Sequence, residues 1–314
     1  MPALQVSTCT NFENDYHNNS KMTILLFEHG SNTKASDSDF PGRWREIISD
    51  PLNLLIEKHP LAGFVRDNMV VLHNGNRVPV EGPGSYYGGF SQILIYNRGV
   101  HEPLEEYVFQ ELIKMLPESP SMLELGAYWG HYSMWLKRLR PAASVFLVEP
   151  ELQHIKTGMA NFRFNNFSGE FIQAFVGKGH FAVDAYLQAR GIAKLDILHA
   201  DIQGFEVEML DDCTQSLQQQ CIDYIFISTH SQQLHDEVLR RLQTFNYRVE
   251  VSSDFDHQTT SFDGFVFASS TTKEKVFCNF KPLGRTDIAE SSPTDLVLEL
   301  AKSLNISPSS SLSE

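Results

Sequence analysis

The chain has 314 residues, of which 42% are hydrophobic and 20% are charged, as in soluble proteins with a sizeable core. Its 39 acidic residues outnumber its 25 lysines and arginines and give a formal charge of −14. This balance argues against a nucleic-acid binder, which needs a basic surface for phosphates, and it suits a cationic ligand.

Membrane and secretion signals are not visible in the sequence. No run approaches the ~18 apolar residues of a membrane span, and residues 1–20 show no basic stretch followed by an apolar core. The cysteines are scattered, without a CxxC pair: Cys9, Cys213, Cys221 and Cys278. We therefore expect free thiols and a cytoplasmic protein with neither a membrane nor a nucleic-acid partner.

Residues 1–100 show no clear periodicity, and we expect them to form an accessory region that includes a substrate lid. Residues 30–42 are rich in Gly, Ser, Asp and Pro, which predicts a loop. Farther along, short apolar runs are interrupted by Gly and Pro. The aromatic stretch 86–90 is a candidate mobile lid over the acceptor pocket.

Residues 101–270 alternate between apolar strand-like runs and amphipathic helical segments. The predicted strands are 121–125, 144–148, 171–176, 196–200 and 224–228. Helices are predicted at 103–116, 132–139, 151–165, 183–190, 205–217 and 234–245. Two late strands, 247–251 and 264–268, lack a helix between them. The pattern predicts an α/β fold with a doubly wound, mostly parallel, seven-stranded, Rossmann-like sheet and an antiparallel edge hairpin.

Residues 271–314 are predicted to be a C-terminal extension with one helix and a frayed tail. The helix is expected to begin at Ser292-Pro293-Thr294-Asp295, which resembles a capping box. The tail from Ser307 to Glu314 is rich in serine.

The segment from Leu123 to Ser133 lies at a predicted strand-to-helix junction and has the pattern Glu-x-Gly-x-x-x-Gly. Glycines there permit a tight turn and the close approach of a ligand to the helix start. Glu149 ends the next strand, 23 residues after Gly126. In such sheets a carboxylate at that place can bind ribose hydroxyls.

The same loop argues against a nicotinamide cofactor. A dinucleotide fold uses three glycines beside the pyrophosphate, whereas this loop carries Tyr128 and Trp129. No Tyr-x-x-x-Lys sequence occurs in the chain, so we rank an oxidoreductase last. S-adenosylmethionine suits the loop better, because it brings an ammonium and a carboxylate but no phosphate.

Several motifs of the α/β region occur together in one known family. They are Glu124-Leu-Gly-Ala-Tyr-Trp-Gly-His-Tyr-Ser, Val148-Glu149-Pro150, Asn161 with Asn165, Val183-Asp184, and above all Asp201-Ile-Gln-Gly-Phe-Glu206. From about Gly99 to Phe267 the chain thereby resembles the FkbM family of methyltransferases. The resemblance implies a class I S-adenosylmethionine-dependent fold that methylates hydroxyl oxygens of sugars, polyketides or other secondary metabolites. The first hundred residues lie outside it.

By position, the resemblance assigns five residues to the cofactor. Glu124 and Gly126 would face its methionine part, Gly130 and Ser133 would lie at the helix start, and Glu149 would bind the ribose.

Further cofactor contacts are expected around this core. Phe175, after the third strand, is expected to flank the adenine, and His101, before a helix, to close over the methionine end. Tyr128 lies in the ligand-facing turn and is counted among the cofactor-binding residues, although the family commonly has Asn there. The family also commonly has Lys in place of His199, which we interpret as a core histidine.

Methylation of an alcohol requires that its proton be removed during the attack. Asp201 follows the strand at 196–200 and His230 follows the strand at 224–228. In an open α/β sheet both would lie at the carboxyl edge, where ligands bind. Our hypothesis is that His230 is the general base and that Asp201 orients it or the acceptor; the alternative for His230 is a helix-capping or solvent-facing residue.

A divalent ion such as Mg²⁺ is an alternative at this edge, with Asp201, His230 and His235 as candidate ligands. No tight ligand spacing supports it, so we assign no metal site. Glu206, near a helix start, either complements the helix dipole or contacts the cofactor amine or the acceptor.

We therefore expect an S-adenosylmethionine-dependent O-methyltransferase that acts on a hydroxyl of a small molecule, a sugar or secondary metabolite. One alternative is an N-methyltransferase on the same fold, which would not need a strong base. Another is a catalytically silent cofactor-binding scaffold, which Tyr128 keeps open. The helix at 293–304 would dock on its own chain or on a second copy, so a homodimer is one expected state.

Overall fold

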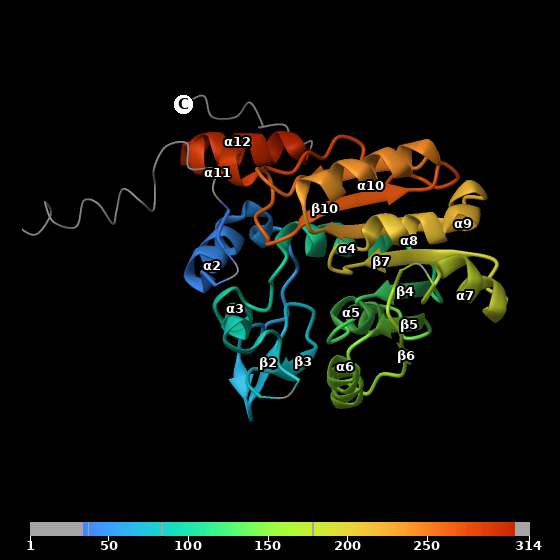
Figure 1. The fold of residues 1–314 in the computed structure, drawn as a ribbon. Coiled ribbons are helices and arrows are strands. Elements are labelled where there is room, and N and C mark those ends of the chain that lie inside the picture. Colours follow the sequence, from blue (N-terminus) through green and yellow to red (C-terminus); the bar gives the residue numbers. More distant parts are fainter. Residues whose placement is uncertain (1–33, 37, 83, 178, 305–314) are drawn as a thin grey trace, which may run out of the picture.

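A seven-stranded sheet forms the centre of the computed structural model, which describes residues 34–36, 38–82, 84–177 and 179–304 (Figure 1). Its strands are β4 (Ser121–Leu125), β5 (Ser144–Glu149), β6 (Glu170–Gln173), β7 (Leu195–Ala200), β8 (Ile222–Thr229), β9 (Arg248–Ser253) and β10 (Gly264–Ser269). They lie in the order β6-β5-β4-β7-β8-β10-β9. The first five are parallel, and β10 runs antiparallel to both β8 and β9. The predicted fold class is thus confirmed.

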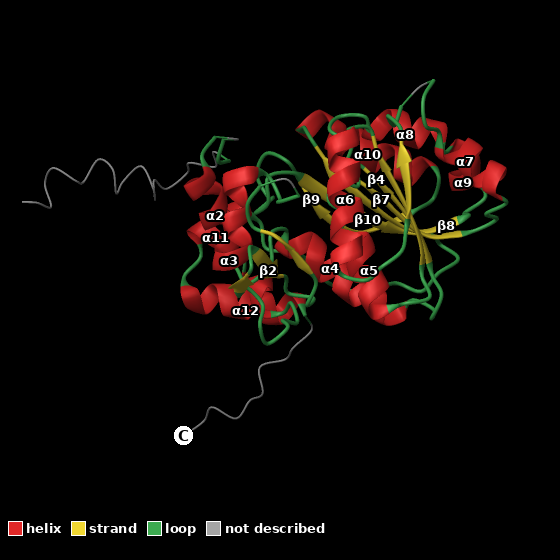
Figure 2. Cartoon of the chain, turned by 90° about the horizontal axis from the view of Figure 1, so that it is seen from below, coloured by secondary structure: helices red, strands yellow, loops and turns green. Residues whose placement is uncertain are grey.

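Helices cover both faces of this sheet (Figure 2). One face packs against α4 (Pro103–Met115), α5 (His131–Leu139) and α6 (Leu152–Phe164). The other packs against α7 (Val183–Arg190), α8 (Glu206–Asp212), α9 (Thr214–Gln218) and α10 (Gln232–Thr244). Because successive side chains of a strand point to opposite faces, Met122 joins the first core and Leu123 the second.

The strand order reverses between β4 and β7, which are neighbours although β5 and β6 separate them in the chain. In open α/β sheets such a reversal leaves a crevice outside the carboxyl ends of the strands. The turns after β4 and β7, which begin at Gly126 and Asp201, therefore meet at one edge of the sheet.

The N-terminal region packs on the α4 and α5 side. It consists of α2 (Phe40–Ser49), η1 (Pro51–Leu54), the antiparallel sheet of β1 (Val65–Arg66), β2 (Met69–Val71) and β3 (Arg77–Pro79), η2 (Gly88–Gln92) and α3 (Ile93–Tyr96). Its buried apolar residues share one core with α4 and α5. Residues 1–33 lie outside the described residues, and division of the chain near 100 and 270 stays a prediction.

The C-terminal extension contains two helices rather than the single one predicted, α11 (Arg285–Glu290) and α12 (Pro293–Ser303). The Ser292 hydroxyl accepts a hydrogen bond from the Asp295 amide, as the capping pattern predicts. Both helices lie on the same side of the molecule as α2 and α3 (Figures 1 and 2). The predicted frayed tail lies outside the described residues. Within the described residues, no helix has both the length and the apolar character needed to cross a membrane.

Several predicted ends are shifted by one or two residues, and three predictions depart further from the structure. α2 begins at Phe40, inside the predicted loop, and β6 ends at Gln173 instead of 176. The helix predicted at 205–217 is divided, because Cys213 leaves helical geometry and the Asp184 carboxylate accepts hydrogen bonds from the amides of Gln215 and Ser216 at 2.7 and 3.0 Å. A side chain on α7 thus caps a second helix, a tertiary contact that helical periodicity does not reveal.

Candidate active site

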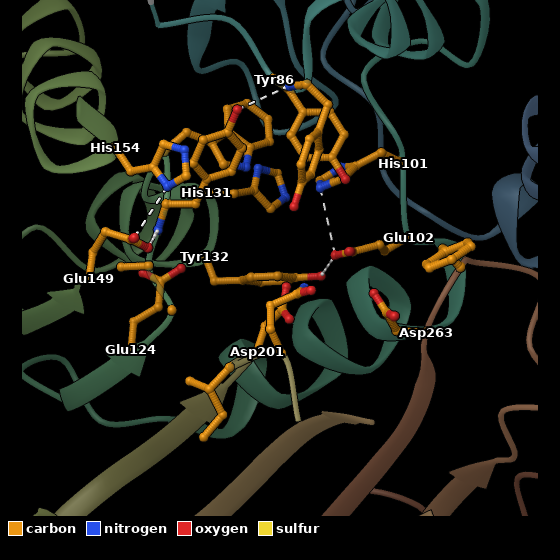
Figure 3. A pocket seen from close by; sticks show the side chains of 18 of the residues that line it. Tyr86, His101, Glu102, Glu124, His131, Tyr132, Glu149, His154, Asp201 and Asp263 are labelled. Atoms are coloured by element: carbon orange, nitrogen blue, oxygen red, sulfur yellow. Dashed lines mark hydrogen bonds and ion pairs between the residues drawn. The ribbon is translucent and has the colours of Figure 1, made fainter. Parts of the chain in front are cut away.

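A cavity of about 570 Å³ lies at the carboxyl edge of the sheet, covered by residues of the N-terminal region (Figure 3). Aromatic side chains form much of its wall: Phe40, Tyr86, Tyr87, Phe90, Tyr128, Trp129, Tyr132, Phe175, Phe205 and Phe262. The lining also includes carboxylates, those of Glu102, Glu124, Glu149, Glu151, Asp201 and Asp263. Arg43 is the one arginine or lysine in this lining within the described part of the chain. The cavity is therefore acidic and partly apolar, which suits a cation with an aromatic group.

The turn after β4 requires glycine at position 126. Gly126 has a φ of 73°, and a Cβ there would lie 1.7 Å from the carbonyl oxygen of Asp201. The Asp201 amide in turn donates to the carbonyl oxygen of Leu125 at 3.0 Å. The two strand ends are thus in backbone contact, and this leaves Gly126 and Asp201 on the cavity wall.

Gly130, the N-cap residue of α5, has a φ of 77° and packs against Phe162, where a Cβ would lie 2.9 Å from the ring. Ser133, in the first turn of α5, donates its backbone amide to Glu124 Oε2 at 3.1 Å. Neither residue lines the cavity, whereas Glu124 does. Burial raises the pKa of Glu124. In the structure Gly130 packs at the start of α5 and Ser133 holds Glu124, and their contact with the cofactor stays a prediction.

Glu149 is held firmly at the end of β5. Its Oε2 accepts from the Tyr128 amide at 3.1 Å and its Oε1 from the Glu151 amide at 3.0 Å, and His154 Nδ1 lies 3.2 Å from Oε1 (Figure 3). The side chain is largely buried yet lines the cavity. Two backbone amides therefore fix the direction of this carboxylate before any ligand binds.

The Tyr128 side chain connects the β4 turn with the N-terminal region. Its hydroxyl accepts from the Tyr87 amide at 3.1 Å and donates to the Ser85 carbonyl oxygen at 3.2 Å. Tyr86, Tyr87 and Phe90 line the cavity, as the sequence predicts for the candidate lid. The tyrosine at the position where the resembling family has Asn thus anchors this covering segment.

Asp201, Glu206, His230 and Asp263, which we call the acidic cluster, meet at the ends of β7 and β8. His230 Nδ1 lies 2.6 Å from Glu206 Oε1, and its Nε2 lies 3.1 Å from Asp201 Oδ1 and 3.5 Å from Asp263 Oδ1. Asp201 and Asp263 line the cavity, whereas His230 does not. The predicted meeting of Asp201 and His230 is thus observed, with two further carboxylates around the imidazole.

The three carboxylates around His230 determine whether its ring is protonated. Burial opposes a charge on His230, but hydrogen bonds to Asp201 and Glu206 and the charge of Asp263 raise its pKa to about 11. With this pKa the ring is an imidazolium at neutral pH, which has no lone pair to take a proton; this argues against the general-base role of His230, which stays a prediction. Burial raises the pKa of Asp263 to about 7, against the opposing charge of His230.

The acidic cluster also bears on the metal alternative. Ligand atoms of Asp201, His230 and Asp263 lie within 4.8 Å of one another. A cation there would compete with the proton on His230. The third predicted ligand, His235, lies elsewhere, 3.0 Å from Thr229 Oγ1 and 2.9 Å from Ser252 Oγ.

The remaining predicted residues divide between the wall and the core. Phe175 lines the cavity and forms a T-shaped pair with Phe205, with 4.6 Å between the ring centroids. His101 lines the cavity too, but it is buried against Glu106. His199 is a buried histidine whose Nε2 lies 2.6 Å from Glu105 Oε1, and it also reaches the cavity wall.

Sequence reasoning missed Asp263. The available signal was the predicted hairpin: β10 runs antiparallel to β8, so Gly264, which starts β10, pairs with Thr229, which ends β8. The residue before an antiparallel strand thus reaches the carboxyl edge of its parallel neighbours. Also missed were His73, Glu102, Glu106, His131 and Tyr132, which tertiary packing brings together.

No protein-family model matches the chain, and no curated protein matches it in sequence. Solved structures similar in fold include the precorrin-6y C5,15-methyltransferase of Geobacter metallireducens, with a TM-score of 0.40 and 15% identity over 54% of this chain and 88% of that chain. TrmK of M. capricolum with S-adenosylhomocysteine has a TM-score of 0.38 and 12% identity, over 52% and 67%.

The O-methyltransferase from Bacillus cereus, in complex with S-adenosylhomocysteine, has a TM-score of 0.39 and 14% identity, over 55% of this chain and 82% of that chain. At such values the strand order, rather than these similarities, establishes the doubly wound fold of this chain. Membership of the FkbM family stays a prediction, and the function has to be argued from the site.

Proposed function

We propose that the chain is an S-adenosylmethionine-dependent methyltransferase whose acceptor is a hydroxyl of a small molecule. The observation that carries the proposal is the fixed Glu149 carboxylate at the end of β5, beside the glycine turn that follows β4. In a doubly wound sheet, a carboxylate at that place binds ribose hydroxyls. The cofactor's positive charges suit the acidic cavity.

The residues present fit this cofactor. Gly126 permits the close backbone approach of the β4 turn to Asp201 that a side chain would prevent, Glu149 would hold the ribose, and the partly exposed Phe175 ring would flank the adenine. Glu124, with one oxygen held by the Ser133 amide, would lie near the amino group. When bound, S-adenosylmethionine supplies an electrophilic methyl group on a sulfonium.

The acceptor would lie between the acidic cluster and the aromatic residues of the N-terminal region. Asp263 lines the cavity and has a pKa raised by burial to about 7, close to the value that favours a general base at neutral pH. We assign it the removal of the acceptor proton. His230, as an imidazolium between Asp201 and Glu206, would hold Asp201 in place. The aromatic wall would exclude water.

The proposed acceptor class, a sugar or secondary metabolite, follows the resemblance to the FkbM family. The proposed cytoplasmic location rests on the scattered cysteines, which lack a CxxC pair. We also propose a homodimer. Val297 and Leu298 of α12 are exposed and would form the contact between its two copies. Sedimentation of the full chain tests that state.

Calorimetric titration with S-adenosylmethionine, S-adenosylhomocysteine and NAD tests the cofactor. We expect binding of the first two, weakened about tenfold or more in Glu149→Gln, since a hydrogen bond to a charged group contributes about 1.5–3 kcal/mol. Glu118→Gln, an exposed change before β4 at the opposite edge of the sheet, is the charge-matched control and should bind normally. If neither sulfur ligand binds the folded chain, the proposal fails.

The same variants separate the rival functions. A normal affinity for S-adenosylhomocysteine without transfer to any hydroxyl or amine acceptor would favour the silent scaffold. Transfer to an amine that survives Asp263→Asn would favour the N-methyltransferase, which needs no strong base. Loss of transfer on chelation, with restoration by Mg²⁺, would favour the metal-assisted alternative.

A further inference from the structure

Three histidines surround one glutamate beneath the cavity, and we call His73, His101, Glu106 and His131 the histidine cluster. They come from four places in the chain: the turn after β2, the segment before α4, α4 itself and the first residue of α5. Each is at most 3% exposed. Figure 3 shows His101 and His131 at the wall of the cavity. The acidic cluster is a separate group of residues.

The glutamate of this cluster is held on one side only. Its Oε1 accepts from the amides of His101 and Glu102 at 3.1 and 3.4 Å, whereas its Oε2 is buried without a hydrogen-bond partner. His73 Nε2 lies 3.2 Å from Oε2, and His131 Nε2 lies 3.6 Å from Oε1. Neither nitrogen has hydrogen-bond geometry, and both are buried without a partner.

Such an arrangement is unusual for a purely structural polar group. Buried nitrogens and oxygens in proteins are nearly always satisfied, and each exception asks for an explanation such as an ion. An imidazole nitrogen that has no hydrogen-bond partner can donate its lone pair to a metal ion.

We propose that His73, Glu106 and His131 bind one divalent transition-metal ion. Their ligand atoms lie within 4.8 Å of one another. Ligands at about 2.0–2.2 Å from one tetrahedral ion lie about 3.4 Å apart. His73 Nε2 lies 3.2 Å from Glu106 Oε2 and His131 Nε2 lies 3.6 Å from Glu106 Oε1, so each imidazole is near this spacing from one of the two carboxylate oxygens. Two imidazoles with one carboxylate suit zinc or iron(II) and not Mg²⁺, which prefers oxygen ligands.

The remaining contacts support a built site. His101 Nδ1 lies 2.6 Å from Glu106 Oε1 and, with the two backbone amides, orients the carboxylate so that Oε2 faces His73. His131 lines the cavity, which provides an entry path for the ion. Because His73 belongs to the N-terminal region and the other two ligands to α4 and α5, the ion would fasten that region to the sheet domain.

Metal binding is tested on the full chain after chelation, by calorimetry with Zn²⁺ and by the visible spectrum with Co²⁺. We expect one equivalent of either ion, a cobalt spectrum of tetrahedral type and a higher melting temperature. His73→Gln and His131→Gln should abolish the uptake. His257→Gln, an exposed histidine, and Asp263→Asn, in the acidic cluster, should leave it intact.

The proposal is overturned if the folded wild-type chain takes up no zinc, no cobalt and, under anaerobic conditions, no iron(II). It is also overturned if uptake is lost in Asp263→Asn but persists in His131→Gln, because the ion would then lie in the acidic cluster. Titration of the wild-type chain shows whether the metal ion binds, even where a histidine variant does not fold. None of these readouts depends on methyl transfer, so the outcome for the metal site is independent of the outcome for the proposed function.

Discussion

The acidic cluster and the histidine cluster use the same residue types in opposite proportions. In the acidic cluster, three carboxylates surround His230 and raise its pKa to about 11. In the histidine cluster, three histidines surround one carboxylate, and His73 has a pKa of about 4. Both imidazoles are largely buried, so burial alone does not decide the outcome. The protonation of a buried histidine therefore depends on how many carboxylates and how many other imidazoles surround it.

That difference assigns distinct chemistry to the two ends of the cavity. The acidic cluster holds a fixed positive charge with carboxylates that can take a proton. In the histidine cluster, burial keeps His73 and His131 neutral, whereas the pKa of His101 is raised, against its burial, by the carboxylates of Glu102 and Glu106.

The largest expected effect is on catalysis by the acidic cluster. Asp263→Asn removes the proposed base and should lower kcat about 10²–10⁴-fold, as for other general bases. Because the carboxylate must be ionised to accept a proton, wild-type kcat should rise with pH through about 7, the pKa of Asp263. The measurement is a rate–pH profile with an acceptor found by screening hydroxylated compounds.

Two controls accompany that profile. Glu208→Gln, an exposed carboxylate on α8, should keep wild-type kcat, and Asp263→Asn should keep its affinity for S-adenosylhomocysteine. An unchanged kcat in Asp263→Asn would show that the base is another group.

His230→Gln should be the most destabilising change at either cluster, because it leaves the buried carboxylate of Glu206 and the partly buried carboxylates of Asp201 and Asp263 without their cation. Loss of one partner of a buried ion pair costs about 3–5 kcal/mol of unfolding free energy. The measurement is urea unfolding at pH 7, with the exposed His257→Gln as the control.

The same change has a pH dependence of known sign. His230 has a folded-state pKa above its usual value of 6.5, so its stabilising contribution is fully present below pH 6.5 and is lost as the pH rises toward about 11. The difference between wild type and His230→Gln should therefore shrink above neutral pH. A difference that grows with pH would contradict the imidazolium.

His73→Phe should cost much less than His230→Gln in protein freed of metal. The His73 ring is neutral and packs edge-on against Trp135 at 4.4 Å, so a phenyl ring of similar volume can replace it. A volume-conserving exchange of this kind usually costs under about 1.5 kcal/mol. If urea unfolding shows a loss as large as that of His230→Gln, the histidine cluster carries a charge and the contrast fails.

Tyr128→Phe should have the smallest effect. It removes one hydroxyl that donates to the Ser85 carbonyl oxygen and accepts from the Tyr87 amide, in the aromatic wall beside the histidine cluster. We expect a loss of about 0.5–1.5 kcal/mol in unfolding free energy, the usual contribution of one hydrogen bond. Denaturation with and without S-adenosylhomocysteine measures it. No loss would mean that Tyr128 does not anchor the segment at 85–87.

The sequence predicted what local patterns encode. β4 and α7 have the predicted ends, and the spacing from Gly126 to Glu149 located the turn and the carboxylate that define one side of the cavity. These predictions were correct because apolar periodicity and glycine turns depend on residues that are neighbours in the chain.

The charge states and the histidine cluster could not be predicted in this way. His73 lies 33 residues before Glu106, and nothing between them indicates that a turn of the N-terminal region reaches α4. The protonation of His230 depends on Asp263, which an antiparallel strand brings to the end of β8. Such contacts arise from tertiary packing and strand order.

A crystal structure of the full chain with S-adenosylhomocysteine tests the central claim most directly. We expect the ribose hydroxyls on Glu149, the amino acid end near Glu124 and the sulfur directed toward Asp201 and Asp263. A ligand bound elsewhere in the molecule, or no ligand in a cavity that is open in the crystal, would contradict the account.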